Sequence, residues 1–251
     1  MLEDVASRYK GIQRVTNPYQ LLHATRPQHG SSVFVLATKC KRENEVVIDD
    51  QEPGQTTVDK ISDDGFTDGI EIRQIIELLE VQNNGGINEA ISKTDANTAA
   101  MMLRNSLVTR LVLLVSRVYA PSREHDMHVA RAFELLKDSA VKAEIETRGP
   151  RGSLDEALET WRKLKADHRL PKVKQFRDKY TAHLGKPNPQ IPLPEFRELF
   201  SFARETTVLL DRLARATGTR TEGLDTWDYQ VRESAEAFWA PWSPKQANPQ
   251  A

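Results

Sequence analysis

Apolar residues recur every three or four positions from Asp68 almost to the end of the 251-residue chain, and this spacing constrains the fold more than any other feature. The spacing places apolar side chains along one face of an α-helix, and that face must be buried against other helices. After residue 66 no segment shows the sustained two-residue alternation of a β-strand, and no internal repeat is present. The sequence therefore predicts an all-α protein whose organised part is a helix bundle.

Three regions differ in composition and predict the domain organisation. Residues 1–66 change character repeatedly, from a short apolar run at Ser32–Ala37 to a turn-rich acidic stretch, so we expect a poorly ordered extension with at most one short hairpin. A docking arm for a partner is the functional alternative for this extension. Residues 67–240 are expected to form the bundle, and the proline-rich residues 241–251 are expected to form a loose tail.

Proline, glycine and capping residues divide the bundle into expected helices. The segment from Ile87 to Tyr119 is expected to be the longest and most central helix, since it is apolar over most of its circumference. Apolar spacing also predicts buried positions for Phe196 and Trp227. The other expected helices lie at about residues 68–83, 127–136, 153–164, 171–184, 194–217 and 227–239, and Ser153 begins its helix with a capping-box spacing.

Overall charge and the single cysteine narrow the functional classes. The net charge of −1 does not indicate a polyanion-binding protein as a whole, so any nucleic-acid surface must be local. Cys40 alone cannot form an intramolecular disulfide or a thiolate metal site, which favours a reducing, cytoplasmic setting. The first residues lack the features of a signal peptide. The longest apolar run, Leu111–Val115, is far shorter than the roughly 20 residues of a membrane span, so no membrane association is expected.

The segment Lys172–Leu184 contains the residues best suited to chemistry. At about 100° per residue, its apolar positions form a stripe about 80° wide, with Arg177 at one edge and His183 at the other, about 120° apart. Arginine holds a phosphate through two hydrogen bonds, whereas histidine titrates near neutrality and transfers a proton in either direction. This pair can cleave RNA without a metal ion or other cofactor, because the reaction needs only a base, a positive charge and an acid.

Positive charge is concentrated around this pair. Between residues 162 and 186 there are nine Lys or Arg residues and two Asp residues, in a chain whose total charge is nearly neutral. Such a segment can attract phosphates, and we expect RNA to contact Lys172, Lys174, Lys179 and Tyr180. The alternative is that these basic residues lie on ordinary solvated helix faces and that the Arg–His spacing arises by chance.

The run Arg177-Asp178-Lys179-Tyr180-Thr181-Ala182-His183 resembles the Arg-x(4–6)-His motif of the HEPN superfamily, in the form found in its AbiU-type abortive-infection branch. The run Leu107–Tyr119, followed by a polar loop and a short helix, is similar to the first long helix of that branch. The similarity covers roughly residues 90–217. It implies an up-and-down helix bundle that forms a homodimer, in which the Arg and His of both chains meet in a cleft.

By this resemblance, the protein is expected to be a metal-independent endoribonuclease of a toxin–antitoxin or phage-defence system, with an antitoxin or another defence protein as a partner. Arg177 would hold and polarise the scissile phosphate, His183 would act as general acid or base, and Asp178 would orient one of them. Gly185 stands where one toxin branch carries a tyrosine, so silencing by modification of that tyrosine is not expected. A non-catalytic helical module that binds RNA or protein is the alternative function.

Two further groups have structural and functional interpretations. His125 and His128 are spaced like metal ligands, but a surface helix start explains them and no metal site is expected. Arg110 and Arg117 lie on the apolar helix. An ion pair with another helix is their structural interpretation, and a contact with the RNA cleft is the functional one.

Overall fold

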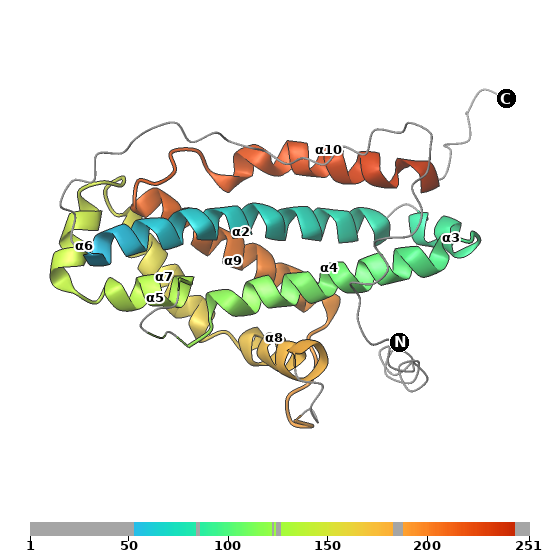
Figure 1. Cartoon of the computed structure of the whole chain (residues 1–251), viewed down its shortest axis with the longest axis horizontal. Helices are drawn as coiled ribbons and strands as arrows, with labels where there is room; N and C mark the ends of the chain where they lie inside the picture. Colours follow the sequence, from blue (N-terminus) through green and yellow to red (C-terminus); the bar gives the residue numbers. More distant parts are fainter. Residues whose placement is uncertain (1–52, 84–85, 122, 124–126, 183–187, 244–251) are drawn as a thin grey trace, which may run out of the picture. The chain divides into compact units, whose positions relative to one another are not determined.

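The computed structural model describes residues 53–83, 86–121, 123, 127–182 and 188–243 (Figure 1). For residues 53–55 and 180–182 only the backbone is described. Residues 1–47 lie wholly outside the described residues, and all the described elements belong to one compact unit, residues 48–251. The expected hairpin near Ser32–Ala37 and the tail from residue 244 also lie outside them, so both stay predictions.

All regular structure in these ranges is helical, and no strand occurs among them, which confirms the all-α prediction. Five longer helices are linked by shorter helical segments and loops (Figure 1). The elements are α2 (Pro53–Asn83), α3 (Ile87–Ser92), α4 (Asn97–Val118), α5 (Val129–Leu135), α6 (Ser139–Glu146), α7 (Ser153–Lys165), α8 (Arg169–Phe176), the π-helix η3 (Arg177–Ala182), α9 (Phe196–Ala216), η4 (Leu224–Trp227), α10 (Asp228–Trp239) and η5 (Ala240–Trp242).

Helix α2 begins at Pro53, well before the expected start near Asp68. Val58, Ile61 and Phe66 recur at three- and five-residue intervals, and all three are buried in the bundle. The expected boundary at residue 66 is therefore corrected, because residues 53–66 belong to the bundle. The acidic and glycine-containing sequence between these apolar residues obscures their helical face, since such residues favour turns when they are considered locally.

The segment expected to form one long helix from Ile87 to Tyr119 forms two helices, α3 and α4. In the turn between them, the Thr94 hydroxyl donates to the carbonyl of Ile91 at 2.8 Å and accepts from the Ala96 N–H at 3.2 Å. Threonine hydroxyls that bond nearby backbone groups compete with helix hydrogen bonds. Among the described helices the longest is therefore α2, with 31 residues, and the prediction for this segment is wrong.

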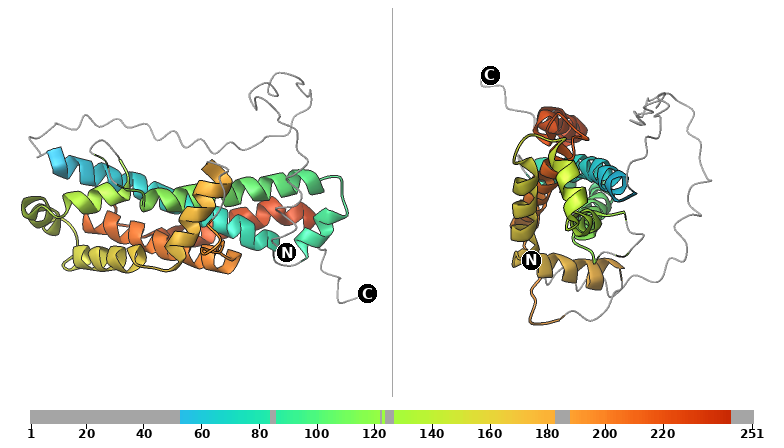
Figure 2. Two further views of the ribbon diagram at one scale, coloured as in Figure 1. Left: turned by 90° about the horizontal axis from the view of Figure 1, so that it is seen from below. Right: turned by 90° about the vertical axis from the view of Figure 1, so that its left-hand side faces the viewer.

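Contacts between helices establish their directions, because partner numbers run in opposite orders between antiparallel helices and in the same order between parallel ones. Helices α2 and α4 are antiparallel, with Asp68–Arg117 and Glu71–Arg110. Helices α7 and α9 are also antiparallel, with Lys163–Glu205 and Thr160–Arg212. Helices α2 and α10 are parallel, with Arg73–Asp228 and Glu77–Arg232. Helix α9 is antiparallel to α2, with Glu80–Arg204 near one end and Asp63–Arg220 near the other. The five longer helices therefore alternate in direction along the chain, as in an up-and-down bundle (Figure 1 and Figure 2).

The core lies between α2 and α9, with α4 and α7 packed around them. The Trp161 ring of α7 lies parallel to Tyr119 and Phe133, at 5.5 Å and 4.5 Å between ring centroids. The Tyr119 hydroxyl shares a 3.0 Å hydrogen bond with Thr206, and burial raises the pKa of this phenol well above its usual range. This aromatic stack joins the C-terminal end of α4 to α7, close to the start of α8.

Two aromatic residues expected in the core are partly exposed. Phe196 is 52% exposed because it lies in the first turn of α9, and Trp227 is 38% exposed at the end of η4. The capping box expected at Ser153 is also absent, since the residue before α7 is Gly152 with a positive φ of 84° and no side-chain cap. A capping box is present instead at Glu195 and Glu198, where α9 begins.

Helix α4 is long and apolar enough, by length and composition alone, to cross a membrane. Counting uninterrupted apolar runs misses this, because its polar residues are spread among apolar ones, so the expectation of no such segment is corrected. Leu111 and Val115 are buried in the core, as in the core helix of a bundle, but only 28% of the apolar window is buried. Met102, which is 67% exposed, and Leu113 lie on an uncovered face of this helix.

Candidate functional site

The predicted Arg–His motif begins where α8 changes into a π-helix. Helix α8 ends at Phe176, and residues Arg177–Ala182 form η3. Short π-helical segments within helices are rare and occur often at functional sites. Because a π-helix bonds each residue to the fifth one along, the spacing of about 100° per residue, on which the expected 120° separation was based, does not apply within Arg177–Ala182. His183 lies outside the described residues, so its position stays a prediction.

Arg177 is held by the residue that follows it. Its Nε donates to Oδ1 of Asp178 at 2.6 Å, and its terminal nitrogen Nη2 lies 2.6 Å from the same oxygen. The Arg177 side chain is 25% exposed, so it is partly shielded from water and still reachable from the surface. A guanidinium has five N–H donors, and an acceptor on its Nε edge restrains its plane while its other edges can face an anion.

Helix α4 supports this part of the chain, since it packs against both α8 and η3. Val173 is fully buried and anchors α8, whereas Lys174, Arg177 and Lys179 are only partly buried. The side chain of Tyr180 lies outside the described residues, so its predicted contact with RNA stays a prediction. The buried face of α8 thus fixes a helix whose other face carries the basic residues of the motif.

Lys174 lies among positive charges. Its pKa is lowered from the ordinary value of 10.5, first because partial burial removes water from the ammonium, and then because Arg177 and Lys165 carry like charge. The Asp178 carboxylate acts in the opposite direction and only partly offsets these effects. The expected basic surface is therefore a local group of cations from three successive helical elements.

The other predicted RNA-binding lysine on α8 has a protein partner. Lys172 donates to Glu198 of α9 at 2.6 Å, and both side chains are partly buried. The contact lowers the pKa of Glu198. This pair joins α8 to the first turn of α9, so the structure gives Lys172 a packing role and directs its charge away from solvent.

Gln175 is a residue of this region that sequence reasoning missed. Its buried side-chain amide donates to the carbonyl of Ile191, and its Oε1 accepts from the N–H of Asn188 at 2.9 Å. These two bonds attach the loop that follows the motif to α8, two residues before Arg177. A signal was available in the proline-rich run at residues 186–194, because such a loop cannot satisfy its own backbone groups through regular structure.

Arg110 and Arg117 form the contacts with another helix that were their structural interpretation. Arg110 makes a two-pronged contact with Glu71, at 2.6 Å and 2.8 Å, and Arg117 is hydrogen-bonded to Asp68, so both arginines join α4 to α2. Burial raises the pKa of Asp68, although its partner opposes this shift. The arginines are thus engaged in the bundle and not directed to the motif on α8.

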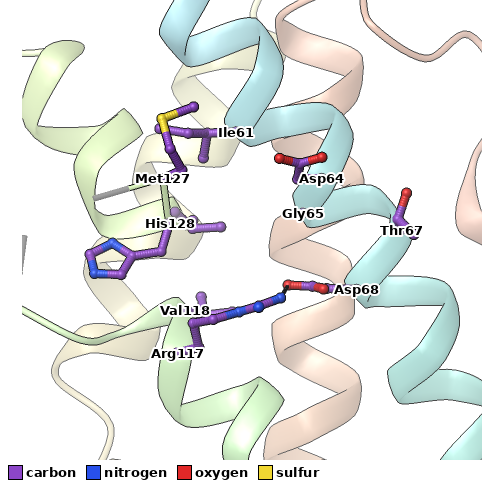
Figure 3. Close-up of a pocket in the computed structure, with 10 residues that line it drawn as sticks. Ile61, Asp64, Gly65, Thr67, Asp68, Arg117, Val118, Met127 and His128 are labelled. Carbon is purple, nitrogen blue, oxygen red and sulfur yellow. Dashed lines mark hydrogen bonds and ion pairs between the residues drawn. The ribbon is translucent and has the colours of Figure 1, made fainter. Parts of the chain in front are cut away.

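A cavity of about 260 Å³ lies beside this second pair (Figure 3). Arg117 and Asp68 point toward each other across it, and His128 from the start of α5 lies at its edge. Of the predicted RNA-site residues whose side chains the structure describes, none lines this cavity. Among the described residues no group of three His, Cys, Asp or Glu side chains is arranged to hold a metal ion, and His125 lies outside them.

Comparison with known proteins identifies the family. No curated protein and no solved structure matches the chain. A HEPN family model described as AbiU2 matches residues 67–238, which run from within α2 to the last turn of α10 and include the whole Arg–His motif. This match covers most of the 251 residues and agrees with the resemblance seen in the sequence. The chain therefore belongs to the AbiU2 family of HEPN proteins, and its helical bundle is a HEPN-type abortive-infection domain.

Proposed function

We propose that this protein is a metal-independent endoribonuclease of a toxin or phage-defence system, and that it cuts RNA with Arg177 and His183. The observation that supports this most directly is the Arg177 guanidinium, which Asp178 restrains within a π-helical segment beside Lys174. A restrained, partly shielded arginine among other cations suits a phosphate better than it suits an uncharged ligand. RNA in the cytoplasm is accordingly the proposed substrate.

The proposed reaction is the attack of a ribose 2′-hydroxyl on the adjacent phosphate. A base removes the hydroxyl proton, the 2′-oxygen forms a bond to phosphorus, and the bond to the 5′-oxygen breaks as that oxygen receives a proton. His183 is assigned proton transfer, Arg177 stabilises the charge on the phosphorane, and Asp178 keeps the guanidinium oriented. The products are a 2′,3′-cyclic phosphate and a free 5′-hydroxyl, and each step uses a side chain of the protein.

A homodimer is part of this proposal, and the uncovered face of α4 supports it. Ala99, Met102, Ser106, Thr109 and Leu113 follow one another at alternating intervals of three and four residues, and all five are exposed and uncharged. This spacing is typical of a helix that packs lengthwise against another helix. Helix α4 also packs against η3, so the helix that would carry the interface contacts the element that contains Arg177. An antitoxin or another defence protein is the further partner that such a toxin requires.

Cleavage in EDTA tests the enzymatic proposal. We expect purified protein to cut assorted RNAs without added metal, and Arg177→Ala and His183→Ala to lower the rate at least about 100-fold. Arg151→Ala and His168→Ala are matched controls, since both side chains are exposed and lie outside the proposed site. The expected cyclic-phosphate end is identified by mass spectrometry of the products. Cutting that persists in both motif variants would contradict the assignment of these residues.

The alternative function is a non-catalytic helical module that binds RNA or protein. Uncut RNA in every assay, together with retained binding, would favour this module over the enzyme. Light scattering tests the dimer, and we expect Thr109→Arg to convert it to a monomer because the new charge would face the uncovered helix of the other copy. A wild-type protein that is strictly monomeric at micromolar concentration would contradict the composite cleft.

A further inference from the structure

Lys165 has an anchored position at the end of α7. Its ammonium lies 5.4 Å from the centre of the Trp161 ring, which is itself stacked against Tyr119 and Phe133. An ammonium over an aromatic ring is attracted to the π-electrons, and the rigid ring limits where the lysine stem can go. Lys165 is therefore an exposed cation with a preferred location, and not a freely moving surface side chain.

Lys165, Lys174 and Arg177 belong to α7, α8 and η3, respectively. Lys174 lies three residues before Arg177 on a continuous helical stretch, and the charges of Arg177 and Lys165 both act on it. Asp178 and Glu134 interact with this group, and each is already hydrogen-bonded to a cation. Asp178 is bound to Arg177, and Glu134, which also interacts with Lys165, is bound first to Lys137. Grouping three like charges costs stability unless an anion joins them, because each charge raises the energy of the others.

Three neighbouring basic residues, Lys163, Arg169 and Lys172, differ from these lysines because they have carboxylate partners. Such pairs are Lys163–Glu205 at 3.7 Å, Arg169–Asp167 at 2.6 Å, Arg169–Glu205 at 2.8 Å and Lys172–Glu198 at 2.6 Å. Within the part of the chain that the structure describes, neither Lys165 nor Lys174 has such an ion pair. Lys165 and Lys174 therefore contribute positive charge that no carboxylate pairs with in the described structure, and this charge acts in the same region as Arg177.

We propose that Lys165 and Lys174 bind the phosphates of single-stranded RNA that follow the phosphate held by Arg177. This inference rests on the proposed function, and it adds that the substrate is a polynucleotide held through several backbone charges. Lysine contacts a phosphate as a point charge and does not distinguish bases, so this track contributes affinity and not sequence specificity. Lys172 is excluded from the track, because Glu198 neutralises it.

Binding of an uncleavable RNA tests the track separately from catalysis. The probe is a fluorescent, fully 2′-O-methylated oligonucleotide, which lacks the attacking hydroxyl, and its affinity is measured by anisotropy over a range of salt concentrations. We expect Lys165→Gln and Lys174→Gln each to reduce the slope of log K against log salt by about 0.7, which corresponds to about fourfold weaker binding at 0.15 M salt. Lys163→Gln is the matched control and should bind like the wild type.

The outcomes separate this inference from the proposed function. Unchanged slopes for both lysine variants overturn the track, even if Arg177→Ala abolishes cleavage. Lysine-dependent binding of an RNA that the wild type never cuts supports the track and rejects the nuclease. An equal loss for Lys163→Gln, or displacement of the RNA by polyglutamate at matched charge concentration, also overturns it, because the surface would then attract any polyanion or an acidic protein. Circular dichroism verifies that the glutamine variants remain folded.

Discussion

The Oδ1 atom of Asp178 accepts a hydrogen bond of 2.6 Å from Nε of Arg177, the residue immediately before it. A contact between adjacent side chains on a helix is unusual, because neighbouring residues on an α-helix point about 100° apart. The contact fixes the guanidinium plane at the beginning of η3. It supports the proposed orienting role of Asp178. The resemblance left open whether Asp178 orients Arg177 or His183, and this contact favours Arg177.

Asp178→Asn is therefore expected to slow RNA cleavage by about 10- to 100-fold, because a displaced catalytic group loses rate steeply with distance. Asparagine keeps the size of the side chain and removes the negative charge that restrains Arg177. The measurement is the single-turnover cleavage rate at saturating protein, which separates the chemical step from RNA binding. Asp64→Asn, at an exposed position on α2, is the control. A wild-type rate in Asp178→Asn would contradict the orienting role.

Gln175→Leu is expected to lower the free energy of unfolding by about 1 kcal/mol, because it removes two hydrogen bonds. The cost is only moderate because water can bond to the loop N–H and carbonyl that Gln175 releases. The cleavage rate is expected to fall further than this small loss of stability would explain, since the loop attached to α8 by Gln175 follows the motif. Urea denaturation and the cleavage assay measure the two effects. Gln190→Leu in the same loop is the control, and equal behaviour of the two variants would show that Gln175 has no special role.

The features that the sequence predicted well are those set by residues close together in the chain. Helix α9 was expected at about residues 194–217 and is found at Phe196–Ala216, because its apolar residues recur regularly and proline precedes it. An ion pair of Arg110 with another helix was one of two interpretations, and the structure selects it through Glu71 of α2. Local periodicity thus located most helices, although it did not show where α2 starts.

The missed features depend on contacts between distant residues or on small differences in backbone energy. Gln175 bonds to groups 13 and 16 residues further along the chain, and no periodic pattern reports such a partner. The π-helix at Arg177 differs from an α-helix by one residue per hydrogen bond, and its sequence has no recognised signature. Lys172 and Lys174 are two residues apart and look alike in sequence, yet only the first meets a carboxylate of α9.

Asp167 is expected to make stability depend on pH. It accepts three hydrogen bonds from Arg169, and these bonds lower the pKa of its carboxyl from the ordinary value of 3.8. A lowered pKa means that the unfolded chain binds a proton more readily, so this stabilisation is complete above about pH 4 to 5 and is lost as the pH falls through the lowered value. Asp167→Asn should therefore cost about 2 kcal/mol at pH 7.

The pH dependence of that variant is the decisive measurement for Asp167. Urea denaturation at several pH values should show the stability difference between the wild type and Asp167→Asn shrinking as the pH falls below about 4, because the unfolded wild-type chain then takes up a proton at Asp167. Asp155→Asn serves as the control, because that carboxylate is largely exposed and its pair with Lys142 is 3.7 Å long. A difference that stays constant from pH 7 to pH 3 would show that the charge of Asp167 is not what stabilises the turn before α8.

Two glycines are expected to respond to alanine in opposite ways. A methyl group on Gly149 would lie 2.4 Å from the carbonyl oxygen of Ala216 and 2.8 Å from that of Arg215, at the end of α9, so the backbone would have to move. Gly149→Ala should therefore lower the free energy of unfolding by about 2 kcal/mol. On Gly65 in α2, the nearest atoms would be side-chain carbons at 3.4 Å, so Gly65→Ala should raise it by about 0.5 to 1 kcal/mol through helix propensity. Urea denaturation of both variants measures these changes, and destabilisation by Gly65→Ala would show that α2 is packed more tightly against α9 than the structure indicates.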